Sequence, residues 1–215
     1  MVAYDVNSGE EIWRWYSSSE EDWAGDWTET ASGGESFNRN IKKEKENYKK
    51  YKDSWKLGGG SIWTTPALDT ELGLLYFGTG NPSPQMEDST RPGDSRNTVS
   101  LVAVDVNTGI LKWAYQQVPH DRWGYDVASP PVLIDFIKDG KSIKAVSQAS
   151  KVGWLYVHDR ATGELLMRSD AFVPQENLFA RPTEEGVRIA PSTFGATTWS
   201  PAAYYPELNS MFIEG

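Results

Sequence analysis

Cysteine and histidine, two side chains that often do chemistry in proteins, are absent and rare respectively in this chain. It has no cysteine, which excludes thiol catalysis, thiolate metal sites, haem attachment and disulfides within the span. The two histidines, His120 and His158, are not spaced as a metal-binding pair, and we expect each to lie in a turn with a structural role. The aromatic content is unusual instead: ten Trp and ten Tyr exceed what an ordinary core uses, which indicates a repeated use of tryptophan.

The overall charge narrows the possible partners. Thirty acidic against 21 basic residues give a net charge of −9, so a phosphate backbone or an anionic membrane surface would be repelled, and nucleic acid is excluded as an expected partner. No apolar run approaches the roughly 18 residues of a membrane span, so we expect no span in this segment. The first five residues also lack the basic and apolar regions of a signal peptide.

Two sequence repeats indicate how the chain is organised. AYDVNSGEEIW (3–13) matches AVDVNTGILKW (103–113), and VHDRATGELLM (157–167) is a weaker third copy with Met in place of Trp. Each copy reads as a strand, a tight turn D-x-x-[ST]-G and a second strand, because Asp can bond the backbone two residues on and Gly supplies positive φ. A second repeat aligns residues 63–78 with 199–214 and also reads as strand, turn, strand.

The two repeats alternate along the chain, which predicts a radial stack of small antiparallel sheets rather than a single sandwich. The sequence therefore predicts an all-β fold, a β-propeller in which the Trp that ends each hairpin fills the space between neighbouring sheets. The stretch NIKKEKENYKKYK (40–52) is the exception and reads as a charged helix or solvated loop between blades. Its lysines form either a solvated face or a docking patch. Residues 58–60 and 81–94 are expected to be loops.

Five segments, in order, resemble the pyrroloquinoline quinone (PQQ) dependent alcohol and methanol dehydrogenases. They are WKLGGGSIW (55–63), LLYFGTGNPSP (74–84), RPGD (91–94), YQQVPHDRW (115–123) and SKVGWLYVHDR (150–160). The resemblance covers nearly the whole chain and implies part of an eight-bladed propeller. Residues 1–215 would then form three to four blades from the middle of such a ring, with the remaining blades on both sides.

The resemblance also implies residues that hold the cofactor. Trp63 matches the family's tryptophan that lies parallel to the PQQ plane, although it could instead fill a gap between blades as Trp199 would. Ser61 matches a hydroxyl that bonds PQQ, or is a simple turn serine. Lys151 matches the basic residue that reaches the quinone oxygens, or is an ordinary surface lysine. Thr198 stands where many members have an asparagine near PQQ.

The implied metal site and catalytic base depart from the family pattern. Asn81 matches the asparagine ligand of a calcium or lanthanide ion, a reasonable role for a neutral oxygen. Gly124 stands where most members have the catalytic aspartate, and glycine cannot remove a proton. Asp126 matches an additional carboxylate ligand of the lanthanide-type members. It could bind metal, act as a displaced catalytic base, or cap a turn.

The resemblance implies an oxidoreductase in which PQQ, with calcium or a lanthanide, accepts hydride from an alcohol or sugar. A cytochrome or other electron acceptor and a periplasmic location would follow from it. The alternative is a PQQ-like propeller that has lost catalysis and serves as a binding or assembly scaffold, which Gly124 and Thr198 favour.

Overall fold

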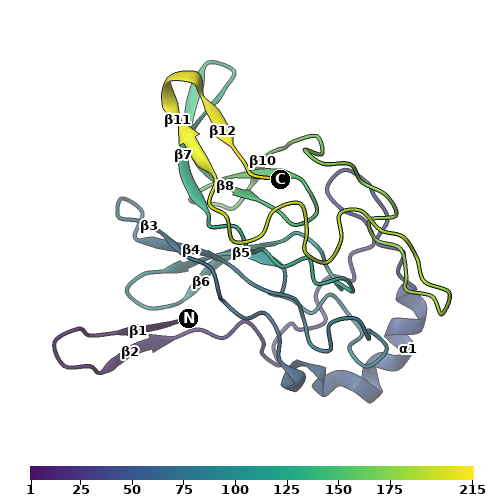
Figure 1. Cartoon of the computed structure of the whole chain (residues 1–215). Coiled ribbons are helices and arrows are strands. Elements are labelled where there is room, and N and C mark those ends of the chain that lie inside the picture. The colour runs from purple at the N-terminus through teal and green to yellow at the C-terminus, as the bar shows by residue number, and fades with distance from the viewer.

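The computed structural model describes residues 1–215 and consists of four antiparallel sheets that follow one another in chain order (Figure 1). Two sheets have four strands each, in the order β3-β4-β5-β6 and β10-β9-β8-β7, and each is one complete blade. The hairpins β1-β2 and β11-β12 flank them on either side. The strands are β1 (Val2–Tyr4), β2 (Glu11–Arg14), β3 (Ala67–Asp69), β4 (Leu74–Gly78), β5 (Ser100–Asp105), β6 (Leu111–Gln116), β7 (Val132–Lys138), β8 (Lys141–Ala149), β9 (Leu155–Asp159), β10 (Leu165–Arg168), β11 (Ala203–Tyr205) and β12 (Ser210–Phe212). This is the partial β-propeller that the alternating repeats predict.

The repeated turn forms as the sequence predicts. In the hairpin between β5 and β6, Asp105 Oδ1 accepts hydrogen bonds from the backbone N–H groups of Asn107 and Thr108, at 3.0 and 3.1 Å. Gly109 then adopts a φ of +70°, a left-handed conformation that favours glycine. The corresponding carboxylates Asp5 and Asp159 make the same pair of bonds in their own turns.

The tryptophans that end these hairpins dock onto the turn of the next sheet, which confirms tryptophan docking. Trp13 of β2 donates its indole N–H to Val106 O at 2.9 Å and lies against Gly109, where an added Cβ would stand 2.5 Å from the ring. Trp113 of β6 repeats this one blade further on, donating to Arg160 O at 3.0 Å and covering Gly163. The turn glycine therefore does two things: it allows the positive φ and leaves room for the neighbouring ring.

The second repeat is also visible in the strands. Ala67 pairs with Tyr76 across β3-β4, and Ala203 pairs with Phe212 across β11-β12, the same pairing two blades further along the chain. The hairpin β11-β12 therefore corresponds to the first two strands of the blade β3–β6. By the same reasoning β1-β2 corresponds to the last two strands of a blade, so the chain contains parts of four blades.

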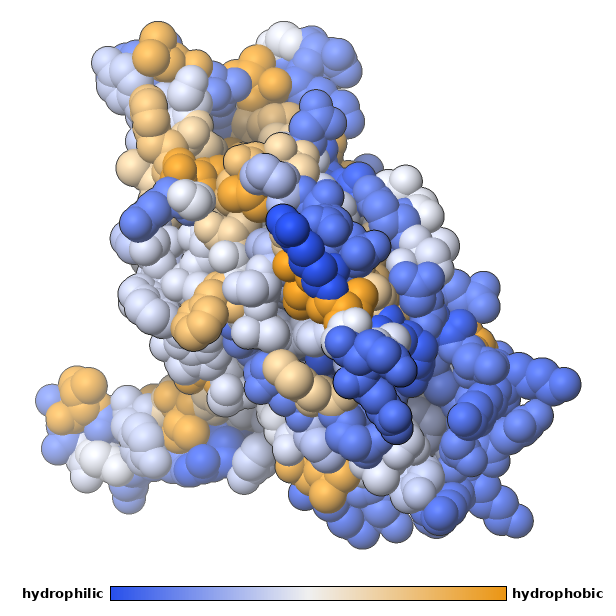
Figure 2. Space-filling model, turned by 45° about the vertical axis from the view of Figure 1, so that its right-hand side comes forward, coloured by the Kyte–Doolittle hydropathy of each residue, from blue (hydrophilic) through white to orange (hydrophobic).

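The charged stretch at 40–52 forms a helix, α1 (Ile41–Tyr51), followed by a 3₁₀ helix, η1 (Lys52–Leu57). Asn40 caps α1 by accepting from the backbone N–H of Lys43 at 3.0 Å. No residue of α1 is buried, so the helix lies on the outside, and the lower right of Figure 2, where α1 lies, is hydrophilic. A second short 3₁₀ helix, η2 (Pro206–Leu208), joins β11 to β12. None of these helices combines the length and apolar character that crossing a bilayer requires.

Candidate cofactor and metal site

A buried ion pair joins two of the residues singled out in the sequence. Lys151 Nζ lies 2.7 Å from Asp126 Oδ2 and also donates to Gly124 O at 2.9 Å. Lys151 is only 8% exposed, so it is not the ordinary surface lysine considered above. It lies in the turn before β9, after the buried end of β8, and this position directs its side chain toward the loop 121–126. Because both groups are largely desolvated, the pair holds this loop to the neighbouring blade.

The loop that carries Asp126 is organised by a second carboxylate, Asp121. Its Oδ1 accepts from the backbone N–H of Trp123, and its Oδ2 accepts from those of Gly124 and Tyr125, at 2.9–3.0 Å. Burial raises the pKa of Asp121, an effect that these N–H donors and the charge of Arg91 oppose. Arg91, fully buried, donates to Asp121 O and to Pro84 O. The RPGD and PHDRW motifs therefore meet and fix the loop's shape.

Gly124 occupies a position that a larger residue could not take without rearrangement. Its φ is +77°, and an added Cβ would lie 2.1 Å from Nε2 of Gln85. Gln85 is on the neighbouring loop, and its amide approaches Trp123 O at 3.5 Å. The space beside Gly124 is thus occupied by a neutral carboxamide, and the nearest carboxylate further along the same loop is Asp126.

Asn81 lies against the same carboxylate. Its backbone N–H donates to Asp126 Oδ1, and its side-chain Nδ2 donates to Pro82 O at 2.9 Å, which leaves the amide oxygen without a protein donor. Ser61 is held close by a backbone bond from Gly80 N to Ser61 O at 2.8 Å. A Cβ on Gly80 would lie 2.8 Å from Asp126 Oδ1 and 3.0 Å from Ser61 Oγ, so these two side chains converge over Gly80.

The aromatic part of the site is a pair of exposed indoles. The Trp63 and Trp199 rings lie 6.4 Å apart at 66°, an edge-to-face contact, and are 43% and 66% exposed. Neither is docked on a turn glycine as Trp13 is, so Trp63 is not an inter-blade filler of that kind here. Thr198, half-buried, precedes Trp199 in a segment anchored by the bond from Ala196 N to Lys151 O at 2.8 Å.

The structure therefore brings the side chains of Asp126, Lys151 and Ser61 together around Asn81 and Gly80. It also links Trp63 to the segment of Thr198 through the ring contact with Trp199. Sequence reasoning missed Asp121 and Arg91, which shape the loop. Both stood inside motifs that pointed to the family, but a carboxylate that accepts only backbone N–H groups gives no signal in residue type.

The histidines are structural, but one is not where the sequence placed it. His158 lies in strand β9 and not in a turn, because the strand extends to Asp159 and the turn begins at Arg160. It is stacked on Tyr156, and burial lowers its pKa to about 4. His120 lies in a loop with a φ of +55° and bonds Gly93 O and Asp88. Neither contacts Asp126 or Lys151.

The side chains of this site offer oxygen ligands for a hard cation and an aromatic ring for a planar cofactor. Asn81 and Asp126 offer oxygen atoms only, which calcium and lanthanides prefer. No cluster of three or more His, Asp or Glu side chains is arranged to hold a metal. The free amide oxygen of Asn81 and the exposed Trp63 ring fit the metal and the plane of a quinone respectively.

The fold and this site define a tryptophan-docked propeller of the quinoprotein type. Comparison with known families agrees: residues 1–177 match the family described as PQQ, glucose/ethanol/alcohol dehydrogenase, beta-propeller domain. The chain belongs to this family.

Individual relatives and solved structures show the same likeness. The chain is 30% identical to the putative dehydrogenase XoxF of Paracoccus denitrificans and 31% identical to the lanthanide-dependent methanol dehydrogenase of Methylorubrum extorquens, in each case over 99% of this chain and 39% of the relative. A europium-containing methanol dehydrogenase superposes with a TM-score of 0.75 at 28% identity, over 98% of this chain and 38% of that one. A quinohemoprotein alcohol dehydrogenase from Comamonas testosteroni gives 0.73 at 29% identity, over 98% and 32%. The chain therefore spans less than two-fifths of the length of these proteins.

Proposed function

We propose that this chain is part of a PQQ-dependent dehydrogenase that oxidises an alcohol or a sugar hydroxyl. The observation that carries the proposal is the buried ammonium of Lys151, which Asp126 and Gly124 O hold in place. The oxygens of Asn81 and Ser61 lie beside the same Asp126 carboxylate. The amide oxygen of Asn81 has no protein donor and Ser61 is exposed, so both oxygens are accessible to a cofactor or metal beside this ammonium. The relatives, which include methanol and alcohol dehydrogenases, support the same activity.

The cofactor would be PQQ with calcium or a lanthanide ion, and PQQ supplies an acceptor for hydride. Trp63 would cover its face, and Ser61 and Thr198 would offer hydroxyls at its edge. The ammonium of Lys151 would stabilise the negative charge that develops on an acceptor oxygen during the transfer. Asn81 and Asp126 would hold the metal, with further ligands supplied from outside this chain.

Asp126 would be both a metal ligand and the catalytic carboxylate. Gly124 has no group to accept the proton of the substrate hydroxyl, and Asp126 lies two residues on. Both oxygens of Asp126 are engaged, Oδ1 by Asn81 N and Oδ2 by Lys151. To accept a proton or bind a metal, Asp126 would release Lys151. The ammonium of Lys151 would then be directed at the acceptor oxygen of the cofactor.

The remaining assignments rest on the family. A cytochrome or other electron acceptor would reoxidise the cofactor, and one relative, from Methylorubrum extorquens, carries the name methanol dehydrogenase (cytochrome c) subunit 1. We place the whole protein in the periplasm on the same ground, and residues 1–215 within one propeller domain.

A second candidate is a propeller that binds PQQ or a partner without catalysis. The observation that favours it is Gly124, which has no side chain at the position where most members carry the catalytic aspartate and whose φ of +77° lies in the left-handed region that favours glycine.

The experiment reconstitutes the complete protein with PQQ and either calcium or lanthanum, and measures dye reduction with methanol, ethanol and glucose. The dehydrogenase proposal predicts reduction that Lys151→Met and Asp126→Asn each abolish while Lys112→Met does not. Bound PQQ without dye reduction for any substrate would favour the scaffold, and no binding of PQQ would contradict the dehydrogenase and leave only a scaffold for another partner.

A further inference from the structure

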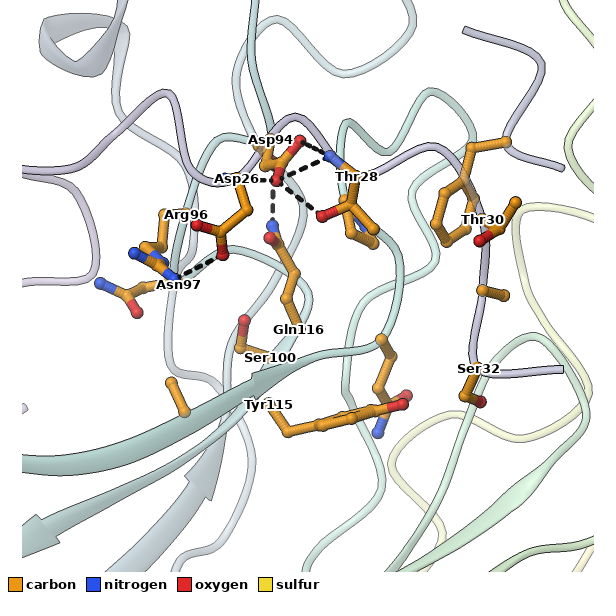
Figure 3. Close-up of a pocket in the computed structure, with 15 residues that line it drawn as sticks. Asp26, Thr28, Thr30, Ser32, Asp94, Arg96, Asn97, Ser100, Tyr115 and Gln116 are labelled. Atoms are coloured by element: carbon orange, nitrogen blue, oxygen red, sulfur yellow. Dashed lines mark hydrogen bonds and ion pairs between the residues drawn. The ribbon is translucent and has the colours of Figure 1, made fainter. Parts of the chain in front are cut away.

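We propose that the cavity beside the start of β5 and the end of β6 is a second binding site, for a small neutral polyhydroxylated molecule such as a monosaccharide or polyol. The cavity has a volume of about 310 Å³ and lies between the loop of residues 26–37 and the blade β3–β6. Figure 3 shows side chains converging on it from residues 26–32, from 94–97 and from the end of β6. It shares no lining residue with the candidate cofactor site.

Polar groups without a protein partner line this cavity. Gln117 is only 3% exposed, and its Oε1 accepts no hydrogen bond, although its Nε2 donates to Gln148 Oε1 at 2.5 Å. A buried, unpartnered carboxamide oxygen is unfavourable unless a ligand or water donates to it. The side chains of Asn97 and Thr30 also line the cavity and make no hydrogen bond within the protein.

The charges around the cavity are already neutralised, which argues against a charged ligand. Arg96 pairs with Asp26 at 2.9 Å (Figure 3). It also pairs with Asp22, outside the cavity. Asp94 is surrounded by donors: Arg39, and the N–H and hydroxyl of Thr28. The groups left for a ligand are hydroxyls and carboxamides, which both donate and accept, as the hydroxyls of a polyol do.

The size and lining of the cavity also suit a small polyhydroxylated ligand. Tyr115, which lines the cavity together with Ser32 (Figure 3), supplies an aromatic ring for the C–H groups of a sugar or polyol. The volume is at the lower end of the roughly 300–1,000 Å³ typical of ligand pockets, which limits the ligand to about one sugar ring. Asn97, which lines the cavity, has a φ of +67°. Such strain in non-glycine residues concentrates at ligand sites.

The test measures binding of glycerol, glucose and acetate to the complete protein by ligand-observed NMR and calorimetry. We expect the two neutral probes to bind weakly and acetate not to bind. Thr30→Val removes one hydroxyl at nearly constant volume, and Asn97→Gly removes the amide while tolerating the positive φ. Each should weaken binding about three- to tenfold, the range for one lost hydrogen bond.

The matched control is Asn209→Gly, the same change at another asparagine of positive φ, in the β11-β12 turn, and it should leave binding unchanged. Circular dichroism of each variant establishes that it is folded. The proposal is overturned if no neutral probe binds, if acetate binds as tightly, or if Thr30→Val and Asn97→Gly have no effect. Loss of glucose binding in Trp63→Ala would also overturn it, because the probe would then occupy the cofactor site. Failure of the dehydrogenase assay leaves this proposal standing.

Discussion

Replacing Lys151 by methionine tests whether the buried ion pair holds the site together. Methionine keeps most of the volume but removes the ammonium, so the Asp126 carboxylate loses its 2.7 Å partner and Gly124 O loses its donor. Both side chains are about nine-tenths buried, and stranding one charge of a buried pair costs about 3–5 kcal/mol. Because a tenth of each remains in contact with water, we expect the low end, about 3 kcal/mol.

The assay is urea denaturation of the complete protein followed by tryptophan fluorescence, with two comparisons. Lys112→Met removes a lysine whose pair with Asp105, at 3.5 Å, is partly exposed, and it should cost less than about 1 kcal/mol. Adding Asp126→Asn to Lys151→Met removes the stranded charge and should recover about 1–3 kcal/mol. A Lys151→Met protein no less stable than Lys112→Met would refute the reasoning.

Three further predictions concern the packing and its pH dependence. Gly163→Ala should destabilise by about 1–3 kcal/mol more than Gly9→Ala, because both have positive φ but only at 163 would a Cβ meet an indole, at 2.6 Å; equal losses in denaturation midpoints would contradict docking. Trp113→Ala should cost about 3 kcal/mol and Trp199→Ala below about 1, measured in the same way. Since the pKa of His158 falls to about 4 in the fold, the unfolded chain binds a proton first as pH drops below about 6.5. As pH falls from about 6.5 to 5, the free energy of unfolding should therefore drop by about 2 kcal/mol more in the parent protein than in His158→Gln. Unfolding free energies that fall in parallel with pH would contradict this.

The fold was predictable because its signals are local. The turn residues Asp105 and Gly109 lie within five positions of each other, and the same chemistry recurs at 5–9 and 159–163. The docking of Trp113 followed from the repeat itself. The state of residues 40–52 remained open between helix and loop, because a lysine-rich stretch without a buried face carries no periodic signal.

The candidate site was less predictable from residue types alone. The contact between Asp126 and Lys151 joins positions 25 apart on two blades, and nothing in their spacing indicates it. Resemblance to a family named both residues, yet their mutual pairing, the burial of Lys151 and the control of the loop by Asp121 appear only in the structure. His158 was expected in a turn but lies in a strand, since the strand extends to Asp159.

The central claim is that the oxygens of Asn81 and Asp126 hold a hard cation beside a quinone that lies on Trp63. The most direct measurement is anomalous diffraction at a lanthanide edge from crystals of the complete protein grown with PQQ and lanthanum. The account predicts one anomalous peak at about 2.3–2.6 Å from Asn81 Oδ1 and from an oxygen of Asp126, with the quinone plane against the indole of Trp63. A peak elsewhere in the ring, or a quinone bound away from Trp63, would contradict it.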